Sequence, residues 1–112
     1  MVDLAKGDYF SASKEFNITL DLDSQNIPAL VQLVELAEYS KAYTAIKVRL
    51  VRFLTREPKN TEVRFLLARV LFSEGGYTEC EKEIDAILAL DSANAKARKL
   101  KDDLTHNKHQ RS

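Results

Sequence analysis

Apolar residues recur along the chain at the spacing of an α-helix, with polar segments between the stripes. Leu30, Leu33, Val34 and Ala37 stand at i, i+3, i+4 and i+7, the pattern of an amphipathic helix. No stretch alternates apolar and polar residues with the period of two that a half-buried strand requires. The pattern therefore predicts an all-α protein with helices at residues 8–22, 27–40, 43–56, 61–73, 77–90 and 94–105.

The polar segments carry signals that end one helix and begin the next. Asn26, Asn60 and Asn94 each close such a segment, and an asparagine can cap the following helix by accepting a hydrogen bond from a free backbone N–H. Pro58 cannot continue the helix before it. Gly75-Gly76 lacks the further glycines and the lysine of a phosphate-binding loop, so we expect it to form a turn.

These features share one period, because Tyr9, Tyr43 and Tyr77 are 34 residues apart and so are the three capping asparagines. A constant period of this length is typical of a helical repeat protein. We expect a repeat domain over residues 1–105, with a half repeat at 1–24, full repeats at 27–58 and 61–92, and a capping helix at 94–105. A disordered polar tail is expected at 106–112. Residues 1–6 align with the end of the first helix of the later units. We therefore expect the chain to be a piece of a longer array, or else a natural start that borrows a packing partner.

The repeat unit resembles the tetratricopeptide repeat, whose pattern is W-x2-L-G-x2-Y, then A-x3-F, then P. The segments that carry the resemblance are Leu30-x2-Leu33-Val34-x2-Ala37, Arg64-x2-Leu67-Ala68-x2-Leu71, Ala12-x3-Phe16, Ile46-x3-Leu50 and Cys80-x3-Ile84, with Ser24, Pro58 and Ser92 at the proline position. The chain departs from the pattern at the Trp and Gly positions. The resemblance implies helix-turn-helix units stacked as a right-handed α-solenoid, and in function a protein that binds other proteins.

Composition excludes several classes of function. The chain carries 17 basic and 17 acidic residues, so no net field draws it to nucleic acid or to an anionic membrane. No apolar run approaches the length of a membrane span. We therefore expect neither nucleic-acid binding nor membrane insertion. The single cysteine and the lack of a signal sequence fit a reducing cytosol.

No set of residues predicts catalysis, a metal site or a cofactor. An enzyme needs convergent polar groups, and the two histidines, His106 and His109, lie in the polar tail without a positioned third ligand. Cys80 occupies a core position of its helix, where we interpret it as a small buried apolar residue. We expect a protein that is not an enzyme.

One helix carries Lys47, Arg49, Arg52 and Arg56 and no acidic residue. The stripe could follow phosphates or bind an acidic partner, although no aromatic residue is interleaved to stack bases. The interpretation we favour pairs it with Glu79, Glu81, Glu83 and Asp85 on the equivalent helix of the next unit.

The resemblance also implies a concave wall built by the first helix of each unit, and it implies the residues that line it. These are Val31, Glu35, Glu38, Tyr39, Phe65, Leu66, Arg69, Phe72 and Lys99. Apolar residues left open on such a wall commonly mark a ligand groove, so we expect Phe65, Leu66 and Phe72 to anchor a partner peptide, unless the two rings pack against neighbouring helices instead. The basic clamp with which some family members hold an acidic chaperone tail is not matched here.

Two functions follow as expectations. The first is a scaffold or adaptor that binds a peptide or helix of a partner protein in this groove. The alternative is a structural segment that associates with copies of itself. In that case the oligomer edge would be Ala12 and Phe16, because the helix that should cover them in a complete unit is missing from the chain.

Overall fold

The computed structural model describes residues 8–111, with side chains as far as residue 106, and this part of the chain is all helical. The helices are α1 (Asp8–Leu22), α2 (Ile27–Ser40), α3 (Thr44–Arg56), α4 (Thr61–Glu74), α5 (Tyr77–Leu90) and α6 (Ala95–Arg111). The predicted fold class is confirmed at this level, and the starts and ends of α1 to α5 agree with the sequence pattern to within one residue.

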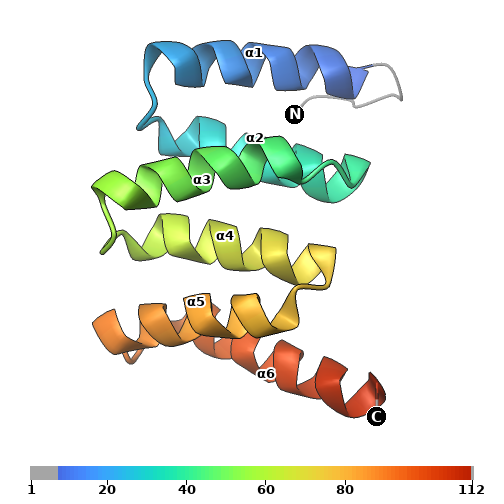
Figure 1. The fold of residues 1–112 in the computed structure, drawn as a ribbon, viewed down its shortest axis with the longest axis vertical. Helices are drawn as coiled ribbons and strands as arrows, with labels where there is room; N and C mark the ends of the chain where they lie inside the picture. Colours follow the sequence, from blue (N-terminus) through green and yellow to red (C-terminus); the bar gives the residue numbers. More distant parts are fainter. Residues whose placement is uncertain (1–7, 112) are drawn as a thin grey trace.

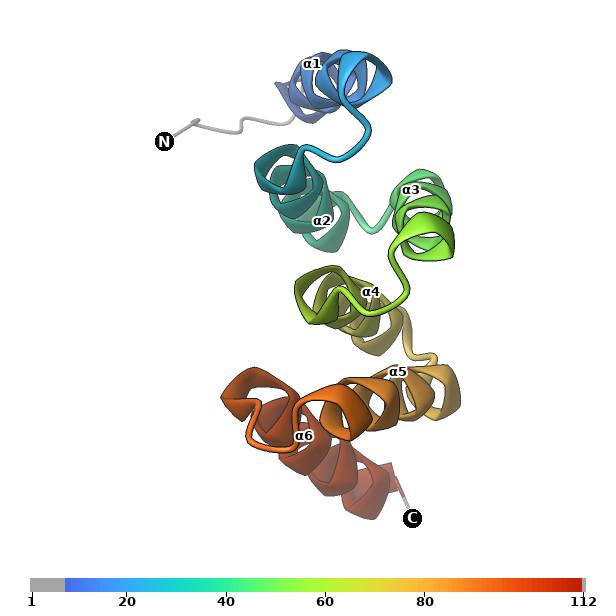
Figure 2. The same cartoon turned by 90° about the vertical axis from the view of Figure 1, so that its left-hand side faces the viewer.

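The six helices form two rows. Figure 2 shows α2, α4 and α6 on one side and α3 and α5 on the other, with α1 above α2 at the top of the stack. We call α2, α4 and α6 the even row, and α1, α3 and α5 the odd row. Each helix packs against its neighbours in sequence, and within the even row α4 also packs against α2 and α6. Within residues 8–111, no two helices of the odd row make a close backbone approach to each other. The result is a repeat-like stack with α1 and α6 at its two ends (Figure 1).

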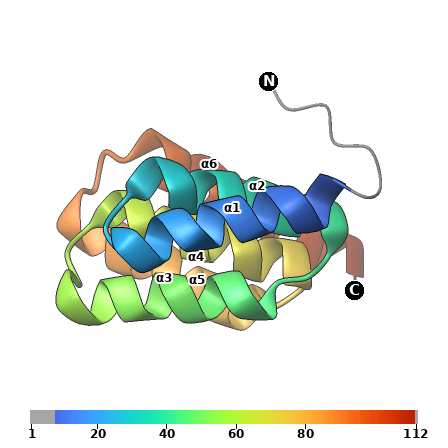
Figure 3. The same ribbon diagram turned by 90° about the horizontal axis from the view of Figure 1, so that it is seen from above.

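Viewed from above, α1 to α4 lie roughly along a common direction, as expected for antiparallel helices joined by short turns (Figure 3). The core runs between the two rows. Its largest fully buried side chains come from α1 to α6 and are Leu20, Leu30, Val34, Leu50, Val63, Val70, Cys80, Ile84, Ile87 and Leu104. The helices α2 and α4 each contribute six buried residues, and both have neighbours on several sides.

The three asparagine caps are confirmed. The side-chain oxygens of Asn26, Asn60 and Asn94 each accept a hydrogen bond of 3.0 Å from the backbone N–H three residues later. Each cap therefore satisfies one of the four donors left free at a helix start. The predicted turn is present as well, since Gly75 ends α4 with a φ of 88°. Lys41, one period earlier, has a φ of 66° at the end of α2.

Equivalent tyrosines make equivalent contacts at the starts of the odd-row helices. The Tyr9 ring lies 5.2 Å from that of Tyr39, near the end of α2. The Tyr43 hydroxyl donates to the carbonyl of Ser73, near the end of α4, at 3.5 Å. The 34-residue period seen in the sequence thus recurs as a geometric relation between an odd-row helix and the even-row helix that follows.

The last helix runs beyond its predicted end at residue 105, because α6 continues to Arg111. Residues 106–112 have no apolar stripe, and for this reason the sequence pattern predicted that the last helix ends at residue 105. They also have no glycine or proline to stop the helix, so backbone hydrogen bonds can propagate through them. Ser112 and residues 1–6, which we aligned with a helix end, lie outside the described residues.

Candidate functional site

The residues predicted to line a groove lie on α2, α4 and α6 and so belong to the even row. Glu35 and Lys99 are exposed, and Tyr39 keeps 70% of its surface accessible. Val31, Glu38, Phe65, Arg69 and Phe72 are half-buried. We call these eight residues, together with Lys96, the even-row surface. Val31, Phe65 and Lys99 stand one period apart, so each helix presents the same position of its repeat on this surface.

An ion pair joins α2 to α4 on the even-row surface. The Arg69 guanidinium donates to both carboxylate oxygens of Glu38, at 2.6 Å and 3.3 Å. The Ser73 hydroxyl donates to the same carboxylate at 3.4 Å. Such a bidentate ion pair fixes the orientation of both side chains, so the centre of the even-row surface is preorganised.

The two phenylalanines of α4 are partly covered by neighbouring helices. The Lys96 ammonium lies 5.9 Å above the centre of the Phe65 ring, a cation–π contact between α6 and α4. The Phe72 ring lies 5.5 Å from that of Tyr77 on α5. Both rings also pack against the core, as the alternative interpretation of these residues anticipated. Both phenylalanines are half-buried, so each keeps only part of its surface accessible to a ligand.

Leu66 is a correction to the predicted site. It is only 3% exposed, so it cannot serve as a surface anchor. The repeat alignment placed Leu66 on the concave wall. However, α4 packs against four other helices, which together cover more of its surface than a single neighbouring helix would. Leu100, one period later, is also buried.

Ala12 and Phe16 are the second correction. Both are half-buried and pack against the core on the side of α1 that faces α2, and so they do not form an uncovered edge. The exposed apolar residues of α1 lie on another face and are Phe10, Ile18 and Leu22, with Phe10 79% and Leu22 86% accessible. The prediction assigned the Phe16 face to a first helix that its own repeat lacks, whereas in the structure this face packs partly against the core.

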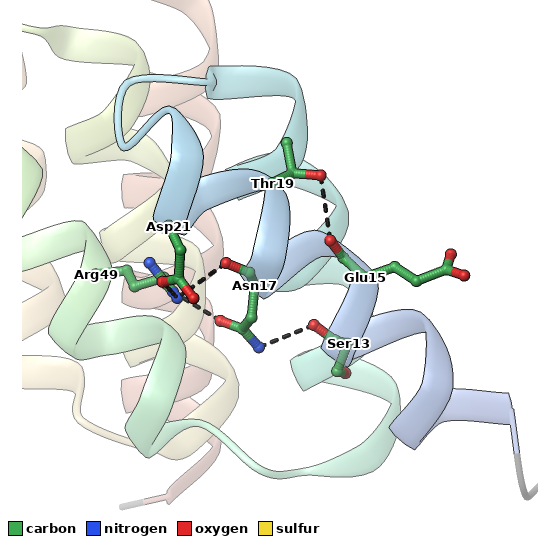
Figure 4. Close-up of polar contacts among 6 residues, drawn as sticks. All are labelled: Ser13, Glu15, Asn17, Thr19, Asp21 and Arg49. Atoms are coloured by element: carbon green, nitrogen blue, oxygen red, sulfur yellow. Dashed lines mark hydrogen bonds and ion pairs between the residues drawn. The ribbon is translucent and has the colours of Figure 1, made fainter.

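The basic stripe of α3 does not make the predicted pairs with α5. Arg49 instead reaches α1, where it donates to Asp21 at 2.8 Å and to the Asn17 side chain at 2.7 Å (Figure 4). Of the predicted acidic partners, Glu83 pairs with Arg64 at 2.9 Å and Asp85 with Lys101 at 3.0 Å. The prediction is wrong because α3 and α5 are not in close contact, and even-row helices supply the cations that α5 uses.

A cleft of about 420 Å³ lies beside this basic stripe, between α1, α2 and α3. Leu20, Leu30 and Phe53 line it with apolar groups. Its charged lining residues are Asp21, Arg49, Arg52 and Arg56. The sequence analysis did not predict this cleft, although it singled out the basic residues of α3, three of which line it.

Cys80 behaves as predicted, as a buried apolar residue. It is fully buried, and its Sγ lies 3.3 Å from the Ala68 carbonyl. Burial, followed by the charges of Glu81 and Glu83, raises the pKa of the thiol from its ordinary value of 9.0 to about 11. The reactive thiolate is therefore scarce at neutral pH.

Within the part of the chain that the structure describes, no three His, Cys, Asp or Glu side chains gather as ligands of one metal ion. None of the helices described has both the length and the apolar character to cross a bilayer. Comparison with known proteins adds no family to these observations: no protein-family model matches the chain, and no curated protein matches it.

Proposed function

We propose that this chain is a protein-interaction scaffold that binds a peptide or a helix of a partner protein on the even-row surface. The observation that carries the proposal is the row of three stacked helices that presents open aromatic and aliphatic surface beside fixed charges. Half-buried Phe65 and exposed Tyr39 are the kind of aromatic anchor that dominates protein interfaces. Helix-in-groove binding uses such a surface.

The proposal includes the architecture that the sequence resemblance implies, a tetratricopeptide-like right-handed solenoid with the even row on its concave side. Two features support it. The two rows alternate with the repeat, and the even-row helices pack on one another whereas the odd-row helices do not. A row that packs tightly on one side and loosely on the other would give the stack curvature.

The distribution of charge on the even-row surface would set the orientation of a bound peptide. The α2 end carries Glu35 and Glu38, whereas the α6 end carries Lys96 and Lys99. A peptide with basic residues at one end and acidic residues at the other would complement both ends. Such complementarity sets orientation and specificity more than affinity.

The proposal is tested by selecting peptides from a display library on the immobilised chain and measuring their affinity by calorimetry. Phe65→Ala should weaken binding by about thirtyfold, which corresponds to the ~2 kcal/mol lost when an interface anchor is truncated. Phe16→Ala is the matched control, because Phe16 is also a half-buried phenylalanine that packs on the core, but on α1. It should leave the affinity unchanged. An equal loss in both variants would mean that Phe65 acts only through folding, and the even-row site would be rejected.

A second candidate function, self-association, is supported by a specific observation on α1. Phe10, Ile18 and Leu22 are exposed large apolar residues on one helix at the end of the stack. Exposed apolar surface of this kind often marks a contact with another protein chain. In this proposal two copies meet through α1 and bury these side chains.

Sedimentation velocity across a wide range of protein concentration tests the second candidate. The unmodified chain should show a mass that rises with concentration, and the double variant Phe10→Glu and Leu22→Glu should remain a monomer. Leu90→Glu, at an exposed leucine of α5, is the matched control and should still associate. A monomeric unmodified chain at every concentration would eliminate this candidate.

A further inference from the structure

The helices at the two ends of the stack, α1 and α6, expose different kinds of residue (Figure 1). On α1, Phe10 is 79%, Ile18 50% and Leu22 86% accessible. As far as the side chains of α6 are described, no large apolar residue of that helix is exposed, and its exposed residues include Arg98 and Lys99. Covering the α1 surface with the α6 surface of another copy would take charged groups out of water without a partner. The apolar end therefore fits a second apolar end better than it fits the polar one.

The exposed apolar residues of α1 belong to a single row on the helix. Phe10, Lys14, Ile18 and Leu22 follow one another at a spacing of four, so they form one ridge of the helix surface. The centre of the row is at residue 16, and reversing the row exchanges Phe10 with Leu22 and Lys14 with Ile18. Rows of this spacing on two helices interlock when the helices cross obliquely. The row is therefore complementary to a second copy of itself that runs in the opposite direction.

The charges beside the row favour this antiparallel direction. Lys14 is exposed and makes no ion pair with any residue whose side chain the structure describes. In an antiparallel pair centred on the row, Lys14 lies within one helical turn of Asp21 of the second copy. The Asp21 side chain is still 68% accessible, although one of its carboxylate oxygens binds Arg49. A parallel pair would instead place Lys14 beside Lys14 and Glu15 beside Glu15, and like charges in contact oppose association.

We propose that two copies of this chain associate through α1 as a closed antiparallel dimer, in which Phe10 of each copy packs beside Leu22 of the other and Lys14 pairs with Asp21 of the other. The proposal rests on the self-association described above as the second candidate function, and adds its direction and its end point. Because both copies use the same surface, association stops at two. Each dimer would carry two even-row surfaces, so a partner with two binding segments would gain avidity.

The apolar area available on α1 indicates a weak dimer. An aromatic side chain buries about 150–250 Å² in an interface, and each copy contributes one aromatic and two aliphatic side chains. Two copies would therefore bury on the order of 800 Å² of apolar side chain, below the roughly 1,200–2,000 Å² of stable complexes. We expect the dimer to form only at high protein concentration.

Chemical crosslinking with a short bismaleimide tests the direction, and native Cys80 does not interfere because it is fully buried. Glu15→Cys and Ser11→Cys place a thiol at exposed polar residues of α1, near the centre of the row and one turn closer to the helix start. In the antiparallel dimer the two copies of residue 15 are about 3 Å apart along the helix axis, and those of residue 11 about 15 Å. Glu15→Cys should therefore crosslink to a dimer, and Ser11→Cys should not.

A charge variant tests the contact between Lys14 and Asp21. Lys14→Glu should weaken the dimer about tenfold in sedimentation equilibrium, because each dimer contains the contact twice. Lys82→Glu, the same change at the equivalent exposed position of α5, is the matched control and should leave the dimer unchanged.

The outcomes separate this proposal from the self-association on which it rests. Equal crosslinking of Ser11→Cys and Glu15→Cys, no crosslink in either variant, equal effects of the two lysine variants, or masses that grow beyond a dimer would each overturn the antiparallel dimer while leaving self-association intact. A monomer at every concentration would eliminate both.

Discussion

Replacing Leu66 by alanine should lower the free energy of unfolding by about 2–5 kcal/mol, the range measured for leucine-to-alanine changes in protein cores. Leu66 is nearly inaccessible within α4, which packs against four other helices. The substitution would remove buried methyl groups and leave a cavity that close-packed neighbours could only partly fill. Chemical denaturation followed by circular dichroism gives the value directly.

The control for this prediction is Leu22→Ala, the same substitution at an exposed leucine of α1. It should change the free energy of unfolding by no more than about 0.5 kcal/mol, as is usual for surface positions. If Leu66→Ala were as mild as the control and instead weakened peptide binding, Leu66 would be the surface anchor that the repeat alignment predicted, and the packing of α4 described above would be wrong.

Removing all three helix caps, by changing Asn26, Asn60 and Asn94 to alanine together, should lower the free energy of unfolding by about 3 kcal/mol. Each asparagine satisfies one backbone donor at 3.0 Å, and the loss of one such cap typically costs about 1 kcal/mol. The caps begin three different helices and share no partner, so their effects should add. Since small domains are stable by only about 5–15 kcal/mol, the melting temperature should fall clearly.

The corresponding triple change to aspartate is the control. Aspartate keeps the acceptor oxygen and places a negative charge at the positive end of each helix dipole. We expect this variant to be at least as stable as the unmodified chain. If the triple alanine variant had the same melting temperature as the triple aspartate variant, tertiary packing alone would position the helix starts.

The agreement between sequence and structure is closest where the interaction is local. The caps, the turn at Gly75 and the helix starts depend on residues within one turn of each other, and their signals could be read directly. Cys80 was predicted correctly for a similar reason, because its place in the apolar stripe of α5 determines which side of that helix is buried. The 34-residue period extended this local information to three successive units.

The errors concern relations between helices. Ala12 and Phe16 are covered because α2 packs on their face of α1, and this packing is a property of two helices. Arg49 pairs with Asp21 because its long side chain bridges to α1. Neither contact follows from the spacing of residues along one helix. A repeat alignment assigns positions to a generic unit, but it does not show how closely a particular pair of units approaches.

The sequence by itself therefore determined the all-helical class, the helix boundaries from α1 to α5 and the repeat that orders them, because periodicity and capping act over a few residues. Only the tertiary structure decided which side chains are available for binding. It buried Leu66 and exposed Phe10 and Leu22. It also left Arg52 and Arg56 beside a cleft, without an ion pair to any residue whose side chain the structure describes. Exposure depends on how many neighbours each helix acquires, and α4 acquires four whereas α1, at the end of the stack, packs closely against one.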